Sequence, residues 1–425
     1  MRKFIVIIGY AVLAVLFMFL ASCTAEMNEI TETSSSSEST VATTVTKSGS
    51  VYELNDVIPE YYHFLPQMAD STSILCKAVK YAKENWKQVD FYNVTYSSSD
   101  TSLPKLSGRV YARKDYADSK SFKGIILYSH SSMAANSESP SVTDNYMMAL
   151  FATAGYVVVC PDYLGFGASQ HYPQYFMNRE STALQAIDML KQVRSWFSTN
   201  GVTVGDKLYN IGYAEGGNAA LAIERLAEEQ YSSEIQFTKT YSGAGAYDID
   251  ATYRNMVSTN EMTSPSLLSF IITGIDNANN MNLDYTQIFK GQLLSQYTDL
   301  LYSKNYTMDQ ITAKIGSTKF TDVYSSEMAD TTSTLSLKLR QEMKNNSLVS
   351  GWKYTGTPIM LFHSTEDTVI PSLNTTEMAA KLNNDGYTNS NLQVINKSMG
   401  NHGTAGLYFN FIALLDIAGV NYTVE

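Results

Sequence analysis

Cysteine is scarce in this chain and shows none of the spacings that bind metals. Three cysteines occur among 425 residues. No C-x-x-C pair and no regular spacing of cysteine with histidine is present, so nothing in the sequence predicts a zinc site. We therefore expect no metal and no other cofactor.

Clusters of basic residues are also missing. Lysine and arginine number 30 against 41 aspartate and glutamate residues, which gives a formal net charge of −11 at pH 7. An acidic chain of this kind repels phosphate backbones, so the composition argues against a nucleic-acid partner. Hydrophobic residues make up 44% of the sequence, which is ample for a large packed core.

The first residues predict a targeting segment. Arg2 and Lys3 precede an apolar run over 4–20, and the sequence LASC ends at position 23. This end resembles the bacterial lipobox, in which the cysteine is acylated once the signal peptide (1–22) is removed. The resemblance implies a lipid anchor on Cys23, which would tether the protein to a membrane of the bacterial cell envelope, at the periplasmic face or the cell surface. An uncleaved spanning anchor is the alternative, although the run is short for one.

A flexible linker is expected over residues 23–50. Its second part, TETSSSSESTVATTVTKSGS, consists almost entirely of serine, threonine and small residues. Such a segment cannot bury enough apolar surface to offset the entropy of ordering it. The folded part is expected to begin near Val51. In the oxidising envelope, a disulfide between Cys76 and Cys160 stays open as an alternative to two buried thiols.

The folded part alternates short apolar runs with amphipathic segments. Runs that predict buried strands lie at 124–129, 155–160, 208–213, 358–363 and 392–397. Helical periodicity is evident at 71–87, 179–198 and 216–229, and two alternating runs at 89–100 and 105–115 predict a β-hairpin. Continuous apolar strands separated by helices indicate an α/β fold with a mostly parallel, doubly wound sheet.

The alternation stops between residues 247 and 349. This stretch is polar, helical in period and rich in methionine, leucine and tyrosine, with no obvious strand of the sheet. Because sheet strands flank it on both sides, we expect it to be an inserted helical cap. The expected organisation is a core over 51–246 and 350–425 that is interrupted by a cap over 247–349.

One turn is a near match to a catalytic motif. The sequence GYAEGG is the G-x-S-x-G nucleophile elbow with Ala214 in place of the serine. The glycines Gly212, Gly216 and Gly217 would remove Cβ atoms that collide with the turn. The backbone N–H of Glu215, at the start of a helix, would be one donor to an oxyanion. The alanine itself supplies no nucleophile.

Two later loops contain the partners that such a nucleophile needs. Asp367 lies in HSTEDTVIP, directly after a predicted strand, and His402 lies in MGNHGTAG, after the next strand. The order of elbow, acid and histidine is the order of the Ser-Asp-His triad in α/β-hydrolases. In that arrangement Asp367 orients the imidazole of His402, which takes the proton from a hydroxyl at position 214.

From residue 91 to residue 415 the chain resembles α/β-hydrolases, most closely the branch of secreted lipases and bacterial lipoprotein esterases. Apart from the triad positions, the resemblance is carried by SHSSMAANSESPS at 129–141, PDYLGFGAS at 161–169 and GAGAYDI at 243–249. It implies an α/β-hydrolase fold with an inserted helical cap. It also implies hydrolysis of carboxylic esters as the activity of the family.

The sequence departs from this branch at two catalytic elements. The resemblance places the oxyanion loop at His130, which the branch usually follows with glycine, whereas Ser131 follows here. Loss of that glycine would tilt the N–H groups of Ser131 and Ser132 away from an oxyanion. We expect His130 to shape the loop and not to transfer protons. The second departure is Ala214.

Three functions remain open. The first is a catalytically silent relative of esterases and lipases, because loss of a serine nucleophile typically costs on the order of a million-fold in kcat. The second is an active serine hydrolase whose serine was replaced by design to give Ala214. The third is a ligand-binding or adhesion lipoprotein that uses the fold as a scaffold. The expected partners are a small acyl ester or related ligand, and a membrane through the anchor.

Overall fold

The computed structural model describes residues 43–58, 73–143 and 146–424. The predicted signal peptide, Cys23 and most of the predicted linker lie outside these ranges. Within them, no helix combines the length and the apolar character that crossing a membrane would require.

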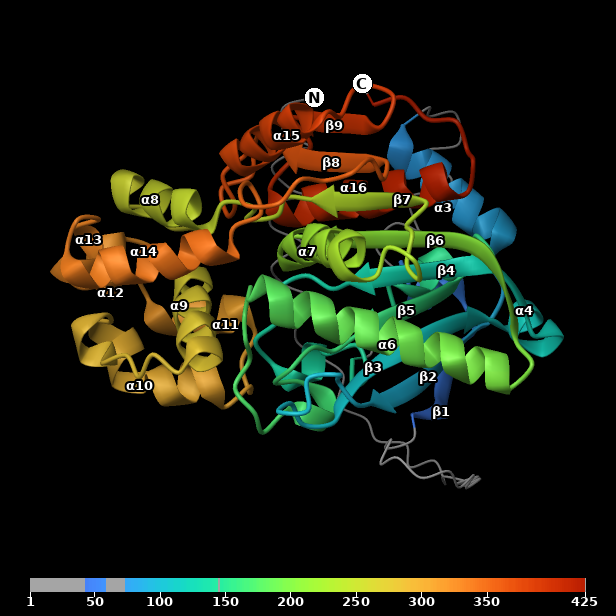
Figure 1. Cartoon of the computed structure of the whole chain (residues 1–425), viewed down its shortest axis with the longest axis horizontal. Helices are drawn as coiled ribbons and strands as arrows, with labels where there is room; N and C mark the ends of the chain where they lie inside the picture. The colour runs from blue at the N-terminus through green and yellow to red at the C-terminus, as the bar shows by residue number, and fades with distance from the viewer. Residues whose placement is uncertain (1–42, 59–72, 144–145, 425) are drawn as a thin grey trace. The chain divides into compact units, whose positions relative to one another are not determined.

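The described chain is built around one nine-stranded sheet in the order β1-β2-β3-β5-β4-β6-β7-β8-β9 (Figure 1). The strands are β1 (Thr44–Val51), β2 (Val89–Tyr96), β3 (Leu106–Arg113), β4 (Ser121–Ser129), β5 (Val157–Pro161), β6 (Thr203–Tyr213), β7 (Lys239–Gly243), β8 (Ile359–Ser364) and β9 (Leu392–Lys397). The predicted hairpin is formed by β2 and β3, and the strands from β5 to β9 run parallel. Parallel strands bring their carboxyl ends to one edge of the sheet, which is where open α/β sheets bind ligands.

Helices cover both faces of the sheet. One face carries α3 (Ile74–Asn85), α5 (Ala149–Ala152) and α16 (His402–Ile417), and the other carries α6 (Arg179–Thr199), α7 (Glu215–Gln230) and α15 (Leu373–Asp385), while α4 (Lys114–Ser119) joins β3 to β4. A parallel strand between two helical layers is buried on both sides, which explains the continuous apolar runs in the sequence. The predicted doubly wound α/β architecture is confirmed.

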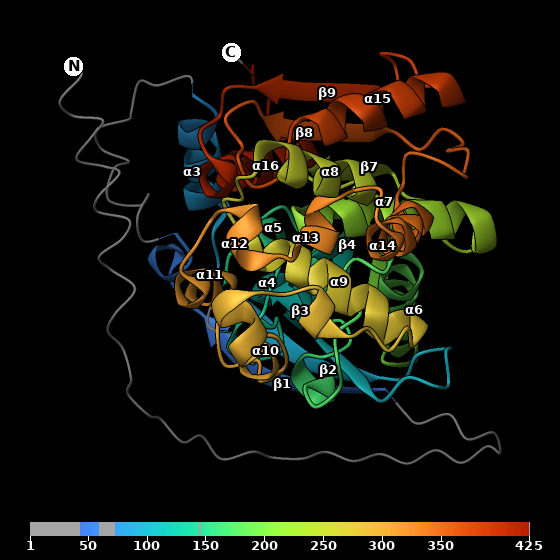
Figure 2. The ribbon, with the colours of Figure 1, turned by 90° about the vertical axis from the view of Figure 1, so that its left-hand side faces the viewer.

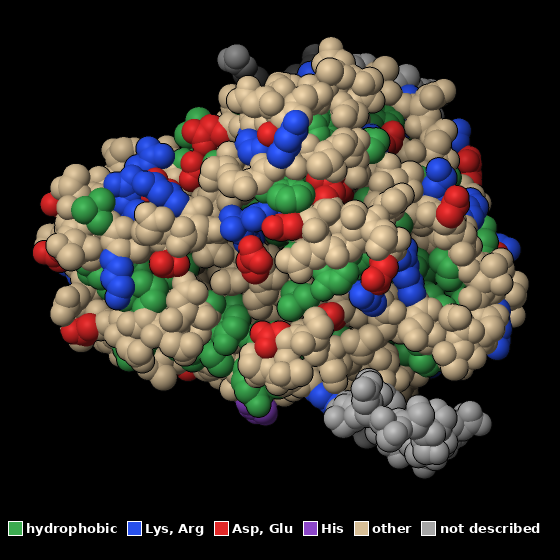
Figure 3. Space-filling model, viewed as in Figure 1, with side chains coloured by type: hydrophobic (Ala, Val, Ile, Leu, Met, Phe, Trp, Pro, Cys, Tyr) green, Lys and Arg blue, Asp and Glu red, His purple; other side chains and the backbone are tan. Residues whose placement is uncertain are grey.

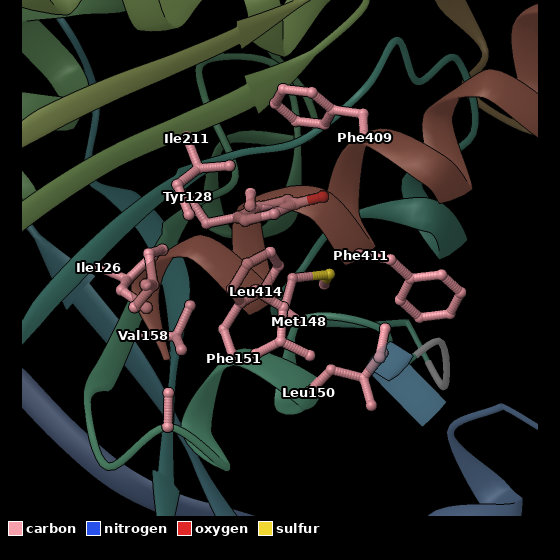
Figure 4. Packing of buried hydrophobic residues seen from close by; sticks show 14 of the residues in the cluster. Ile126, Tyr128, Met148, Leu150, Phe151, Val158, Ile211, Phe409, Phe411 and Leu414 are labelled. Atoms are coloured by element: carbon pink, nitrogen blue, oxygen red, sulfur yellow. The ribbon is translucent and has the colours of Figure 1, made fainter. Parts of the chain in front are cut away.

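Aliphatic residues of the central strands form the core under α5 and α16. Ile126, Val158 and Ile211 come from three neighbouring parallel strands and lie near Phe151 and Leu414 (Figure 4). All five side chains are at most 1% exposed. Burial of a side chain of this size contributes about 1.5–3 kcal/mol. This packing fixes α16 against the sheet and so determines where that helix begins.

Between β7 and β8 the chain leaves the sheet and forms a group of helices at the carboxyl ends of the parallel strands (Figures 1 and 2). These are α8 (Ile249–Thr259), α9 (Pro265–Asn279), α10 (Gly291–Tyr302), α11 (Met308–Ile315), α12 (Phe320–Val323), α13 (Ser326–Ala329) and α14 (Thr334–Asn346). They share an apolar cluster that includes Ile271, Phe289 and Phe320. The helices thus occupy most of the stretch for which the sequence predicts a cap.

Two strands differ from the sequence-based expectation. Residues 44–50 were expected to belong to a flexible linker, and this is wrong, because they form most of β1. That strand lies at the edge of the sheet and is largely exposed, so its serine and threonine residues need no apolar burial. Strand β7 was missed because KTYSG is not an apolar run. Its buried hydroxyls are satisfied instead: Thr240 donates to Glu224 (2.5 Å), and Ser242 donates to the carbonyl of Gly217 (2.7 Å).

Cys76 and Cys160 are both free thiols in this structure, and both are buried. Cys76 belongs to α3, whereas Cys160 lies in the central strand β5. Burial raises the pKa of the Cys160 thiol, which keeps it in its unreactive protonated form. Of the two alternatives left by the sequence, the structure therefore has the pair of buried thiols and not the disulfide.

We predict that alkylation will detect no disulfide between these two cysteines. Iodoacetamide should leave Cys160 unlabelled in the native protein, because that side chain is 0% exposed. After unfolding without a reductant, both cysteines should be fully labelled, as peptide mapping by mass spectrometry can show. A cross-linked peptide that contains Cys76 and Cys160 in the unreduced digest would contradict the prediction.

Candidate active site

The turn between β6 and α7 holds Ala214 in a backbone conformation that alanine rarely adopts. Its φ is 57° and its ψ is −119°, a region that costs a non-glycine residue about 1–3 kcal/mol. The N–H of Ala214 donates to the carbonyl of Gly243 (2.9 Å), and the carbonyl of Ala214 accepts from Gly217 (3.0 Å) and Asn218 (3.2 Å). The strained turn is thus present although it carries no serine.

Three glycines let the backbone pack closely around this turn. A Cβ atom on Gly212 would lie 1.9 Å from the carbonyl oxygen of Gly216. A Cβ on Gly216 would lie 2.2 Å from the carbonyl oxygen of Ser129, and one on Gly217 equally close to that of Gly243. None of the three positions accepts a side chain unless the backbone moves. The glycine pattern of GYAEGG is therefore explained by the approach of α7 to β4 and β7.

The acid and the histidine that the sequence singled out lie side by side. Asp367 follows β8, and His402 is the first residue of α16, just after β9. The Nδ1 atom of His402 lies 2.6 Å from Oδ2 of Asp367. Since a carboxylate can only accept, Nδ1 carries the proton, and Nε2 is left as the basic nitrogen. The ring of His402 is part of the lining of a cleft that also contains Ala214.

The carboxyl group of Asp367 is held in its ionised form. Burial by itself would raise its pKa, but hydrogen bonds from His363 and His402 keep the pKa well below its usual range. Its Oδ1 atom also accepts the backbone N–H groups of Val369 (2.9 Å) and Ile370 (3.0 Å). A carboxylate that is fixed by several donors can orient an imidazole and stabilise its protonated form.

Sequence reasoning gave no role to His363, which the structure places next to Asp367. Its Nε2 atom lies 3.4 Å from Oδ2 of Asp367 and 3.0 Å from the carbonyl oxygen of Ile370. Its Nδ1 atom lies 2.7 Å from the hydroxyl of Thr375. His363 thus approaches the same carboxylate oxygen as His402. It lies near the end of β8, four residues before Asp367, and nothing in the sequence distinguishes it from an ordinary histidine at the end of a strand.

The predicted oxyanion loop directly follows β4, whose last residue, Ser129, pairs with Gly212 of β6. Ser131 and Ser132 line the same cleft as Ala214 and Glu215. The backbone N–H groups of Ser131, Ser132 and Glu215 donate no hydrogen bond to another backbone group in the described ranges. No backbone acceptor in these ranges therefore competes for the three N–H groups.

Both ring nitrogens of His130 lie near backbone carbonyl groups. Its Nδ1 atom lies 2.7 Å from the carbonyl oxygen of Ser131, and its Nε2 atom 3.3 Å from that of Asp162. Burial lowers the pKa of His130, so the ring is neutral at pH 7. These contacts are consistent with the prediction that His130 shapes the loop.

A cleft of about 670 Å³ lies above the turn, between the sheet and the inserted helices. Its apolar wall is rich in methionine: Met133, Met147, Met148, Met177 and Met308. Methionine is flexible and polarizable, so this wall can adapt to ligands of different shape. Ser264, Leu267 and Asp309 line the cleft from the inserted helices. Sequence reasoning missed these residues, because they meet the elbow only in the folded chain.

Glu215 has a side chain that the sequence did not explain. It is 8% exposed and it lines the cleft. Burial raises the pKa of Glu215 to about 8, so the group is a neutral acid at pH 7. It also lines a much smaller cavity behind the cleft, together with His130 and Tyr163.

The described residues contain no group of three or more histidine, cysteine, aspartate or glutamate side chains that is arranged to hold a metal ion. His402 lines the cleft together with Ala214, and its imidazole is hydrogen-bonded to Asp367. A base, an acid that orients it, backbone donors and a nucleophile are the parts that acyl transfer requires.

Comparisons with known proteins agree with this geometry. The family model described as secretory lipase matches residues 133–410. No curated protein matches the chain. Among solved structures, a candidate hydrolase from Legionella pneumophila has a TM-score of 0.73 at 18% identity, covering 88% of this chain and 96% of that one.

Two further solved structures share the fold at low identity. The rice cell wall degrading esterase LipA from Xanthomonas oryzae, in a ligand-bound form, has a TM-score of 0.68 at 18% identity, covering 88% of this chain and 96% of that one. Candida antarctica lipase A has a TM-score of 0.57 at 13% identity, with 79% of each chain covered. The predicted α/β-hydrolase fold is confirmed.

We predict that Gly216→Ala destabilises the protein because its Cβ would collide with the carbonyl oxygen of Ser129. The free energy of unfolding should fall by about 3 kcal/mol, as chemical denaturation can measure. The matched control is Gly403→Ala in α16, where the nearest atom to the new Cβ lies at 3.8 Å. That variant should stay within about 1 kcal/mol of the parent. Equal stability of the two variants would contradict the steric account of the elbow.

We also predict that Glu215 makes the protein less stable in alkaline solution. Its pKa is raised in the folded state, so its contribution is fully present below the pKa of an unfolded glutamate and is lost as pH rises to about 8. The loss is on the order of 4 kcal/mol. Denaturation curves between pH 5 and pH 9 should show a smaller decline for Glu215→Gln than for the parent. The exposed Glu84→Gln variant should decline like the parent, and an equal decline in all three would refute the prediction.

Proposed function

The chain belongs to the secretory lipase family, and on that basis we propose that it is an acyl-ester-binding protein of esterase/lipase type that does not hydrolyse its ligand. The observation that carries this proposal is the geometry of the turn at Ala214 and of the residues around it. The strained turn, the hydrogen bond between Asp367 and His402 and the unpaired backbone donors are all present around Ala214. These features support a site that can orient an ester carbonyl but has no atom that would attack it.

The expected roles of the residues follow from their geometry. An ester carbonyl oxygen in the cleft would accept hydrogen bonds from the N–H groups of Glu215 and of Ser131 or Ser132, and the start of α7 would add positive potential. In a serine-bearing enzyme, Nε2 of His402 would take the proton of the attacking hydroxyl while Asp367 holds the ring. A methyl group at position 214 has no proton to give and no lone pair. The bound ester would therefore stay intact.

A second candidate function is an active esterase from which a serine at position 214 was removed. The ionised state of Asp367 and the 2.6 Å contact with His402 favour it, since a base that has nothing to deprotonate does not need such an arrangement. The two candidates share one ligand class and one set of residues. They differ only in the residue that stands at position 214 in the functional protein.

We extend the proposal to the location of the protein. Acylation of Cys23 and a linker of about twenty residues would hold the body near a membrane surface without a spanning segment. The ligand would then be met outside the cytoplasm, which agrees with the secretory character named in the family description.

The test is restoration of the hydroxyl. We predict that Ala214→Ser hydrolyses short-chain p-nitrophenyl esters at least about a thousand-fold faster than the parent, because triad residues act as a unit. The double variant Ala214→Ser/His402→Asn should return to the background rate. A serine variant that folds normally but stays at background would show that the site can no longer catalyse. Ester hydrolysis by the parent at a rate that depends on His402 would show that position 214 is not the nucleophile position.

A further inference from the structure

An apolar pocket of about 220 Å³ lies between α6 and the strands on which that helix packs. Valine, alanine and aromatic side chains make up most of its described lining, and it shares no lining residue with the cleft. Phe122 lines the pocket and Tyr128 lines the cleft, from opposite ends of β4. At roughly 3.3 Å per residue, their Cα atoms are about 20 Å apart. The pocket is therefore a separate site.

The floor of the pocket is apolar and aromatic. Phe122, Val157, Val193 and Phe197 line it and are at most 7% exposed. The rings of Phe122 and Phe197 stack with their centroids 6.2 Å apart, and Trp196 meets Phe197 edge-on at 6.0 Å. Water finds few partners on such a surface, and an apolar cavity of roughly 150 Å³ already holds a benzene ring. The pocket thus has the size and the surface of a site for an alkyl chain.

The rim of the pocket is polar and carries a positive charge. Lys120, which directly follows α4, is exposed and is the one charged side chain in the described lining. Its Nζ atom donates to the backbone carbonyl of Asn200 (3.1 Å), which lies at the same rim. An ammonium group has three hydrogens, so Lys120 can also donate to a ligand. An apolar floor with a cation at the rim matches a ligand that has an alkyl chain and a negatively charged end.

The acids nearest to the pocket are paired with lysines. Burial raises the pKa of Tyr92, which lines the pocket, and the charges of Asp90 and Asp118 raise it further. Asp90 is paired with Lys47 (2.8 Å), and Asp118 with Lys114 (2.8 Å). On the face drawn in Figure 3, basic side chains lie among acidic ones along the edge where Figure 1 places α4. The acidic net charge of the chain is therefore not concentrated at this rim.

From these observations we infer that the pocket under α6 binds a medium-chain fatty acid, with the alkyl chain on the apolar floor and the carboxylate at Lys120. A methylene group takes up about as much space as a water molecule, roughly 30 Å³ in the liquid. A pocket of about 220 Å³ therefore has room for roughly seven chain carbons. Octanoate has seven carbons beyond its carboxyl group. The inference goes beyond the proposed function and does not depend on it, because the two sites share no lining residue.

The first experiment measures the limit of chain length by isothermal titration calorimetry at pH 7 with the parent protein. Butanoate, hexanoate, octanoate and decanoate are compared below the concentrations at which they form micelles. Each added methylene should tighten binding by about three- to fourfold up to octanoate, and decanoate should gain no more than about twofold in total because the pocket is full. An affinity that keeps rising at the same rate to decanoate would indicate adsorption to an open surface and would overturn the inference, as would failure of octanoate to bind.

A variant that partly fills the pocket tests where the acid binds. Ala112 lines the pocket and is 3% exposed, and leucine has three more carbons than alanine. Ala112→Leu should shift the limit from octanoate to about five carbons and weaken octanoate binding at least about tenfold. The matched control, Ala380→Leu, lies at an exposed position of α15 and should keep the limit at octanoate. An Ala112→Leu protein that has the circular dichroism spectrum of the parent and an unchanged limit would place the acid elsewhere, such as in the cleft, and would overturn the inference.

The charge of the rim is tested by comparing octanoate with 1-octanol. The parent should bind octanoate about fivefold more tightly, as expected for an exposed ion pair, and Lys120→Gln should abolish this preference while octanol still binds. Lys123 follows Phe122 in β4, is exposed and points to the opposite face of the sheet, so Lys123→Gln should keep the preference. Equal binding of octanol and octanoate by the parent would assign the pocket to neutral alkyl chains and overturn the inference. A preference that survives Lys120→Gln would also overturn it, and neither result would affect the proposed function.

Discussion

The candidate active site depends on how closely α7 approaches the strands around it. Gly212, Gly216 and Gly217 allow backbone contacts that any side chain would prevent, and these contacts force the strained turn at Ala214. The same approach sets the start of α7, and with it the N–H of Glu215, beside the loop that follows β4. Asp367 and His402 come from another part of the sheet, because they follow β8 and β9. The site is thus assembled by the order of strands in the sheet and not by neighbouring residues in sequence.

Much of this arrangement could be predicted from the sequence, because several of its causes are local. A glycine-rich turn between a strand and a helix has a distinct pattern, and buried parallel strands form continuous apolar runs. Strands β1 and β7 were not predicted, and the reason is physical. An exposed edge strand and a strand whose hydroxyls bond to a neighbouring helix both lack that apolar signal. The alternation of hydrophobic residues identifies strands that are stabilised by burial, and these two have other means of stabilisation.

The rest of the site could not be predicted, since it depends on contacts between distant segments. His363 supports Asp367 only because the loop after β8 folds back on itself, and Glu138 faces Asp309 only because the inserted helices close over the cleft. Glu215 is the clearest example of a side chain whose environment could not be predicted. Its backbone role could be predicted from the elbow pattern, but nothing in the sequence indicates that its side chain is buried.

The backbone conformation of Ala214 and the burial of Glu215 bear on whether the site is still in use. A non-glycine residue at positive φ and a buried carboxyl group both lower the stability of the folded chain. A helix can follow a strand without either of them. Proteins retain such costly features where a ligand or a reaction needs them. The strained turn at Ala214 is the conformation that a nucleophile requires. Under the proposed function, a site without the hydroxyl keeps the geometry that orients an ester but lacks the atom that would attack it.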